Sequence, residues 1–137
     1  MSRHHLFNPD GLPPATGFSY GALAASGRLL HIAGITGLEA DGSLSDSLVD
    51  QFAVALMGVA RVIDDGGGAP SDLVAMTIYT TDVEGYIDNL APIGVRYREV
   101  FGKHFPPIAL IGVERLFDPK AMIELVCVAV VPDQDGV

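Results

Sequence analysis

His104-Phe105-Pro106-Pro107-Ile108-Ala109-Leu110-Ile111-Gly112-Val113 is followed closely by Ala121-Met122-Ile123-Glu124-Leu125-Val126-Cys127-Val128-Ala129-Val130. Both stretches are almost wholly apolar, and the second contains a single acid, Glu124. Paired prolines cannot continue a helix, because proline lacks the backbone N–H that a helix needs. Short apolar runs rich in β-branched residues are typical of buried strands. The sequence therefore predicts a turn at Phe105-Pro106 and strands at residues 108–116 and 121–131.

Upstream, the pattern alternates between strands and helices. Strands are predicted at residues 18–25, 28–35 and 72–81, and helices at residues 46–65 and from Pro92 to near Gly102. Gly66-Gly67-Gly68 is expected to end the first helix. The order strand–strand–helix–strand–helix–strand–strand predicts an α+β two-layer sandwich, with a mixed six-stranded sheet and two helices on one face. The 137 residues are predicted to form one domain, of which residues 1–17, with three prolines, are an N-terminal arm.

Composition narrows the function. Eight Lys and Arg residues against 17 Asp and Glu give a net charge of −9, and the basic residues form no cluster. Binding to nucleic acid or to an anionic membrane is therefore disfavoured. The single cysteine excludes an intrachain disulfide and suits a reducing cytoplasm. No signal peptide and no membrane-spanning run is expected.

The histidines and the cysteine do not form a pattern typical of a metal or cofactor site. His4 and His5 are adjacent residues in the arm, and no His-x-x-x-His motif or cysteine pair exists. His31 lies in an apolar strand and is interpreted as a core or interface residue. His104 is a candidate for the rim of a pocket, and Cys127 is interpreted as a buried structural thiol. Neither a metal nor a cofactor is expected.

Glu124 is the candidate catalytic residue, because a carboxylate in an apolar strand needs a partner or a purpose. It can lie in a pocket, where it would orient or deprotonate a water molecule. The alternatives are an interface ion pair with Arg115 or Arg28, or solvation at the end of the strand. Tyr20 is either a residue lining a cleft or a packing residue.

Four segments together resemble a known family. They are Gly17-Phe18-Ser19-Tyr20, Ser26-Gly27-Arg28-Leu29-Leu30-His31-Ile32-Ala33-Gly34, Tyr97-Arg98-Glu99-Val100-Phe101-Gly102-Lys103-His104-Phe105-Pro106 and Ile123-Glu124. Their order and spacing resemble the RidA (YjgF/YER057c/UK114) family from about residue 17 to residue 131.

The resemblance implies a chorismate-mutase-like fold and a homotrimer whose sheets form a central barrel. It also implies ligand clefts between subunits and no cofactor. Deaminating members hydrolyse enamines or imines to a keto acid and ammonia. Transferred to this sequence, Glu124 would handle the water, and the cleft would contain Tyr20 as well as Ile108, Ala109 and Leu110.

Two residues depart from that pattern. The arginine that holds the substrate carboxylate in deaminases is replaced by Ile108, and Gly94 stands where many members have asparagine. Arg115 is predicted to face away from Ile108, which leaves Arg28 or Arg96 of a neighbouring subunit as substitutes. We expect a divergent subgroup whose apolar pocket takes a less charged small molecule.

The sequence is compatible with two functions. One is a cofactor-free hydrolytic deaminase of enamine or imine metabolites that lacks the usual arginine. The other is a non-catalytic ligand-binding or chaperone-like trimer. The ribonuclease activity of some relatives is disfavoured by the acidic charge.

Overall fold

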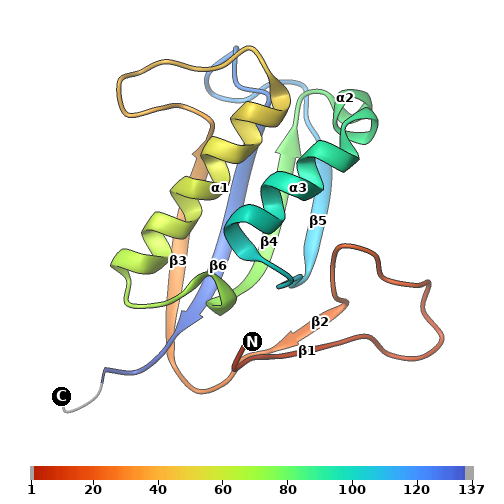
Figure 1. Ribbon diagram of the computed structural model, residues 1–137, viewed down its shortest axis with the longest axis vertical. Helices are drawn as coiled ribbons and strands as arrows, with labels where there is room; N and C mark the ends of the chain where they lie inside the picture. The colour runs from red at the N-terminus through yellow and green to blue at the C-terminus, as the bar shows by residue number, and fades with distance from the viewer. Residues whose placement is uncertain (1, 135–137) are drawn as a thin grey trace.

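Residues 2–134 are described by a computed structural model (Figure 1). Their strands form a four-stranded sheet in the order β3-β6-β4-β5 and a separate pair, β1-β2. The strands are β1 (His5–Phe7), β2 (Gly21–Leu23), β3 (Arg28–Thr36), β4 (Leu73–Thr80), β5 (Ile108–Gly112) and β6 (Ile123–Val131). The helices are α1 (Leu48–Asp65), α2 (Val83–Asp88) and α3 (Leu90–Phe101), with a 3₁₀ turn, η1, at Pro70–Asp72.

The larger sheet is mixed, and helices cover one of its faces. β6 is antiparallel to both β3 and β4, whereas β4 and β5 are parallel. In Figure 1 the helices α1 and α3 lie side by side across this sheet. The predicted α+β class is confirmed. The single six-stranded sheet is not found in this form, since β1 and β2 pair with each other apart from the other four strands.

The first helix follows the apolar spacing that predicted it. Ser47 caps its start, because the Ser47 hydroxyl accepts a hydrogen bond from the Asp50 amide. Phe52, Leu56 and Ile63 are among the side chains that the helix buries against the sheet. The predicted helix at residues 46–65 is therefore confirmed to within two residues at its start.

The Phe-Pro turn is anchored inside the core. The Tyr97 ring stacks on Phe101 and Phe105, and its hydroxyl donates a hydrogen bond of 2.6 Å to the His104 carbonyl oxygen. His104 Nε2–H donates to the Leu73 carbonyl oxygen at 2.7 Å. His104 is buried, and burial lowers its pKa. His104 lies in the core beneath the turn and does not line either of the two cavities beside the turn.

The N-terminal arm is ordered by buried polar contacts. His4 Nε2 lies 3.1 Å from Asp72 Oδ1 and 2.9 Å from the Val130 carbonyl oxygen. Since both neighbours are acceptors, Nε2 carries the proton, and Nδ1 accepts from the Ala25 amide. Arg3 reaches the same Asp72 carboxylate at 3.1 Å. These contacts place residues 5–7 beside residues 21–23, so the predicted strand at 18–25 is shorter and pairs with the arm rather than with β3.

No described helix covers the other face of the four-stranded sheet, which we call the open face. Leu29, Ile111 and Val126 are 61%, 44% and 38% exposed there. His31 is also exposed on this chain, whereas Cys127 faces the core, where burial raises the pKa of its thiol to about 12. Several large apolar side chains exposed on one face of a sheet indicate a contact surface.

Arg115 does not lie on a strand. β5 ends at Gly112 rather than at residue 116, so Arg115 lies in the following loop, where its guanidinium donates to the carbonyl oxygens of Leu116 and Phe117. The expectation assumed that Arg115 and Ile108 lie on the same strand, and this assumption is wrong. Within residues 2–134, no helix combines the length and apolar character that crossing a membrane requires.

Candidate functional site

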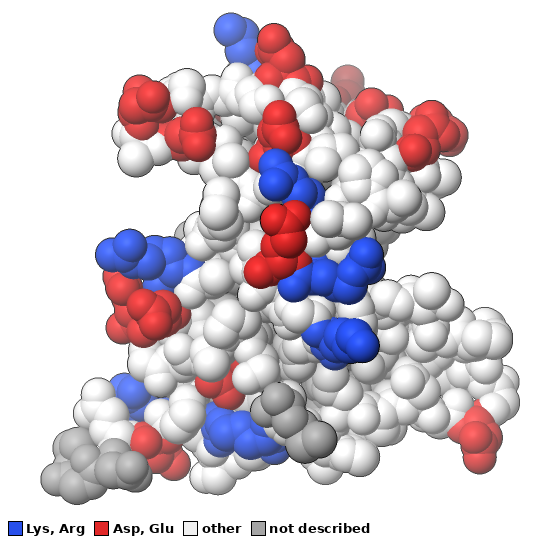
Figure 2. Space-filling view, in the orientation of Figure 1, with Lys and Arg blue, Asp and Glu red and all other residues white. Residues whose placement is uncertain are grey.

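The larger cavity lies where α3, β5 and the arm meet. Its volume is about 600 Å³. Figure 2 shows the part of the surface formed by the arm as almost uncharged, with basic side chains beside it at the middle of this face. The lining residues come from the arm, all three helices, both parallel strands and the Phe-Pro turn: Thr16, Gly17, Phe18, Phe52, Ile78, Tyr86, Leu90, Ile93, Gly94, Tyr97, Arg98, Phe105, Ile108 and Leu110.

A short clip holds the arm against the Phe-Pro turn. The Ser19 hydroxyl donates to the Phe105 carbonyl oxygen at 2.6 Å, and the Ser19 amide donates to the Pro106 carbonyl oxygen at 3.3 Å. Phe18, next to Ser19, lines the larger cavity and also a second hollow of about 390 Å³. The turn that the sequence singled out therefore forms the boundary between two cavities.

Four of the five candidate site residues lie at these two cavities. Tyr20, Ile108 and Ala109 line the smaller hollow, whereas Ile108 and Leu110 line the larger cavity. The Tyr20 hydroxyl donates to the Pro13 carbonyl oxygen at 2.9 Å, so it is used within the arm. Ala109 and Leu110 line different cavities because successive side chains of a strand point to opposite faces, whereas Ile108 at the start of β5 lines both.

Glu124 lies elsewhere within the same chain. Its neighbours Ile123 and Leu125 are fully buried under the helices, so Glu124 itself points to the open face. Ile108 pairs with Met76, a core residue, and thus lies on the helix-covered face. β4 also separates β5 from β6. The expectation that Glu124 belongs to the same pocket wall as Ile108 is therefore wrong for a single chain.

A bulge in β3 makes room for the Glu124 carboxylate. The register between β3 and β6 shifts between Ile32 and Ile35, and Gly34 lies in this irregular segment. A Cβ atom at Gly34 would lie 2.5 Å from Glu124 Oε2, so a larger residue at this position would displace the carboxylate. β-bulges often redirect side chains next to functional sites. Among the ion pairs of residues 2–134, none joins Glu124 to Arg28 or Arg115.

Arg98 lines the larger cavity, although the sequence pattern did not single it out. Arg96, a candidate substitute for the missing arginine, forms ion pairs with Asp50 at 3.3 Å and Glu99 at 3.9 Å. Arg98 lies one turn after Gly94, and both residues line the cavity. Residues four apart are neighbours on a helix surface, so this spacing was a signal that could have been read from the sequence.

The remaining polar groups of the cavity are hydrogen-bonding groups rather than bases. Desolvation by burial raises the pKa of Tyr86 to about 12 and that of Tyr97 still further. Both phenols are therefore protonated near neutral pH. Within residues 2–134, no three His, Cys, Asp or Glu side chains are grouped so as to hold a metal ion.

Comparisons with known proteins agree on the fold. The family model described as Endoribonuclease L-PSP matches residues 10–131. The crystal structure of YyfB from Yersinia pestis, a protein of unknown function in the conserved Rid family, has 29% sequence identity and a TM-score of 0.84. That match covers 93% of this chain and 98% of YyfB. Among curated proteins, no match is significant.

Two further structures are more distant. A member of the YjgF/YER057c/UK114 family from Mycobacterium tuberculosis has 25% identity and a TM-score of 0.62, with 93% of this chain and 99% of that chain covered. TdcF from E. coli, crystallised with bound serine, has 22% identity and a TM-score of 0.65. The second match covers 90% of this chain and 92% of TdcF, and it supports the fold alone.

Proposed function

We propose that this chain, which belongs to the Endoribonuclease L-PSP family, binds a small molecule with a mostly apolar body. The observation that carries the proposal is the cavity between α3, β5 and the arm. Its volume of about 600 Å³ suits a small ligand, since such pockets measure roughly 300–1,000 Å³. Its walls are aliphatic and aromatic side chains with few polar groups, which is the usual composition of a ligand pocket.

A small molecule is favoured over RNA, the substrate that the family description suggests. The chain has 17 acidic and eight basic residues, so its net charge is −9. RNA binding depends largely on Lys and Arg residues that neutralise phosphates, and a strongly acidic protein repels the RNA backbone. The cavity lining contains aromatic side chains but only one basic residue among the described residues, whereas a groove for a single strand is positively charged along its length.

The proposal includes a homotrimer that assembles through the open face. Leu29, Ile111 and Val126 support it, because exposed apolar side chains on a sheet surface are stabilised by burial against another copy. Assembly would also bring Glu124 of one copy towards a cavity of another. The ligand would then lie in a cleft between subunits, as the resemblance to the RidA family implies.

Hydrolytic deamination is the second candidate, and the position of Glu124 favours it. This half-buried carboxylate lies over Gly34 beside a β-bulge, without an ion-pair partner among the described residues. It can take a proton from water while the oxygen attacks the carbon of an imine C=N bond. The proton passes from Glu124 to the nitrogen and gives a carbinolamine. Its hydroxyl proton then moves to the nitrogen as the C–N bond breaks, so the products are ammonia and a ketone, with no cofactor required.

Binding can be tested with methyl-labelled isoleucine in the full chain. The neutral probe 3-phenylpropanamide is expected to shift the signals of Ile78, Ile93 and Ile108, which line the cavity, and to leave that of Ile111 on the open face unchanged. The variant Ile108→Trp fills the cavity and should weaken binding. Shifts confined to Ile111, or no shift at millimolar probe, would contradict the proposal.

Hydrolytic deamination is tested by a separate activity assay. Freshly generated 2-aminoacrylate would be followed with the wild type and with Glu124→Gln, which keeps the shape of the side chain and removes the base. Turnover above buffer that falls at least tenfold in the variant supports the deaminase. Equal rates in wild type, variant and buffer would leave the non-catalytic binding protein as the function.

A further inference from the structure

Arg98 is the one charged residue that lines the larger cavity among the residues that the structure describes. The other lining residues are apolar, apart from a threonine and two tyrosines. The guanidinium makes one end of the cavity positively charged, whereas the remaining walls are apolar. A ligand with one charged end and an apolar body would therefore bind in a single orientation.

The guanidinium folds back along α3. A Cβ atom at Gly94 would lie 3.1 Å from Arg98 Nη1 and 3.9 Å from Cζ, so the head group lies over the bare backbone of Gly94. Any larger side chain at residue 94 would push it outward. Gly94 and Arg98 thus form a pair in which the glycine makes room for the cation.

Arg98 has no recorded protein partner among residues 2–134. The ion pairs of this part of the chain involve Arg3, Arg61 and Arg96, and the side-chain hydrogen bonds likewise omit Arg98. Arg96, two residues away, is neutralised by Asp50 and Glu99. The N–H donors of Arg98 are therefore available to a ligand.

We infer that Arg98 is the anion-binding residue of this cavity and that the ligand is a monocarboxylate with an apolar body. The inference rests on the proposed function, because it names the chemical class of the molecule that occupies the same cavity. The planar guanidinium matches a carboxylate with two parallel hydrogen bonds. The apolar walls match the remainder of the molecule.

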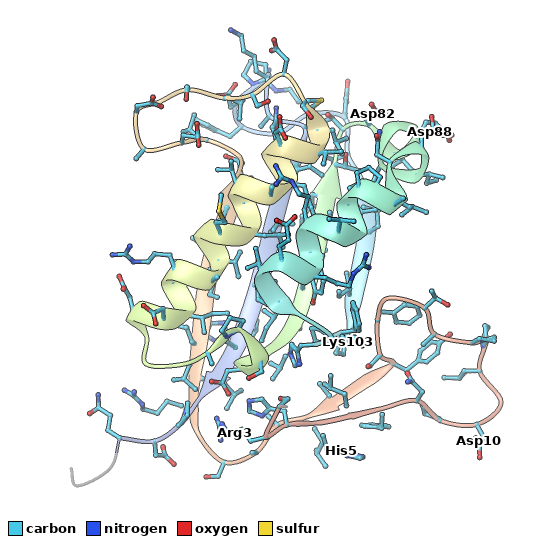
Figure 3. The ribbon with its side chains drawn as sticks, in the orientation of Figure 1. Arg3, His5, Asp10, Asp82, Asp88 and Lys103 are labelled. Atoms are coloured by element: carbon cyan, nitrogen blue, oxygen red, sulfur yellow. The ribbon has the colours of Figure 1, made fainter. Side chains whose placement is uncertain are left out.

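A single negative charge fits this site better than two. One cation is available in the cavity lining, and the whole chain carries a net charge of −9, which disfavours approach of a dianion such as a phosphate monoester. Figure 3 labels Lys103 between the end of α3 and the arm, so a second cation lies outside the cavity lining. Lys103 therefore provides a control for general charge effects.

The test compares two molecules of the same shape, 3-phenylpropanoate and 3-phenylpropanamide, by titration calorimetry with the full chain. The wild type is expected to bind the carboxylate about tenfold more tightly than the amide. A hydrogen bond to a charged group strengthens binding, but solvent weakens this contribution at an exposed site. In Arg98→Met this preference should disappear, so that the variant binds both molecules with equal affinity.

Two controls separate a local effect from a general one. Arg96→Met and Lys103→Met each remove one positive charge near α3 and should keep the preference. Because Arg98 is exposed, Arg98→Met is expected to fold normally, which thermal unfolding checks. Gly94→Ala keeps the charge and displaces the guanidinium by a few tenths of an ångström, so the preference should decrease without disappearing.

Three results would overturn the inference. Equal binding of both molecules by the wild type shows that the cavity binds small molecules without using Arg98, so the proposed function survives alone. An undiminished preference in Arg98→Met, or equal losses in Arg96→Met and Lys103→Met, assigns the effect to another group. Binding of neither molecule would contradict the inference and the proposed function together.

Discussion

The two faces of the four-stranded sheet are built from alternate residues of the same strands, yet they have different properties. On β6, Leu125 is fully buried beneath the helices, whereas Val126 is 38% exposed on the open face. The covered face closes the core and forms the wall of the larger cavity. The open face contains apolar side chains that no described element covers. One face therefore accounts for folding, and the other indicates association.

The same division separates the candidate functional groups. Arg98 and Ile108 belong to the helix side of the sheet, and Glu124 belongs to the open face. A site that uses Glu124 together with Ile108 would therefore have to combine two copies of the chain. A site that uses only Arg98 and the apolar walls is complete within one copy.

The largest expected effect comes from truncating neighbouring residues on the two faces. Leu125→Ala should lower the free energy of unfolding by about 3 kcal/mol, because it leaves a cavity in a fully buried region. Val126→Ala should cost less than about 1 kcal/mol in the monomer, because its side chain is already partly exposed. Urea unfolding followed by circular dichroism measures both values. Equal losses would mean that the two faces are equally covered.

Introducing a charge on the open face tests association directly. Val126→Lys should weaken self-association at least 30-fold, about 2 kcal/mol, because an unpaired charge would be buried between copies. The variant should still give the circular dichroism spectrum of a folded chain. Sedimentation velocity at micromolar concentration measures the mass. A wild type that sediments as a monomer, or a Val126→Lys variant with unchanged mass, would exclude assembly through this face.

Two histidines provide a comparison through pH. Burial lowers the pKa of His104, so the folded chain binds this proton less readily than the unfolded chain does. Stability should therefore fall as the pH decreases below the ordinary histidine pKa of about 6.5, and should level off above it. Urea unfolding between pH 5.5 and 7.5 measures this slope. His31, exposed on the open face, serves as the matched residue.

The control variants are best compared in the Val126→Lys background, where both histidines are studied in the monomer. His104→Asn should flatten the dependence of stability on pH in this window, and it should also lower stability at pH 7.5 through loss of the hydrogen bond to Leu73. His31→Asn changes an exposed side chain and should leave stability at pH 7.5 unchanged. A slope that His104→Asn leaves unchanged would show that His104 does not titrate in this range.

Much of the fold could be predicted because its signals are local. The spacing of Phe52, Leu56 and Ile63 identified α1, and the glycines from Gly66 marked its end. The resemblance to the RidA family, carried by the Phe-Pro turn and by Ile123-Glu124, is confirmed by the family match. β1 and the short α2 were missed, because a three-residue strand and a six-residue helix have little periodicity of their own.

The site was harder to predict for a geometric reason. Alternation along a strand shows which residues share a face, but it does not show that β4 lies between β5 and β6. Glu124 and Ile108 were consequently placed in one wall. Gly94 was noticed only as a departure from the family pattern, although its distance of four residues from Arg98 would have indicated a pair on one helix face.

The smallest expected effect comes from a substitution on the helix-covered side, at Gly94 of α3. Gly94→Ala should raise the free energy of unfolding by about 0.5–1 kcal/mol, because alanine loses less conformational entropy than glycine in a helix interior. The three atoms nearest to the new methyl group all belong to the flexible end of Arg98, so the side chain can give way without a shift of the helix. The same change displaces the guanidinium, and carboxylate binding should weaken a few-fold while stability increases. A loss of stability on this substitution would show that contacts of the guanidinium over Gly94 stabilise the fold more than alanine stabilises the helix. Arg98 would then be a structural element of α3 rather than a ligand-binding group.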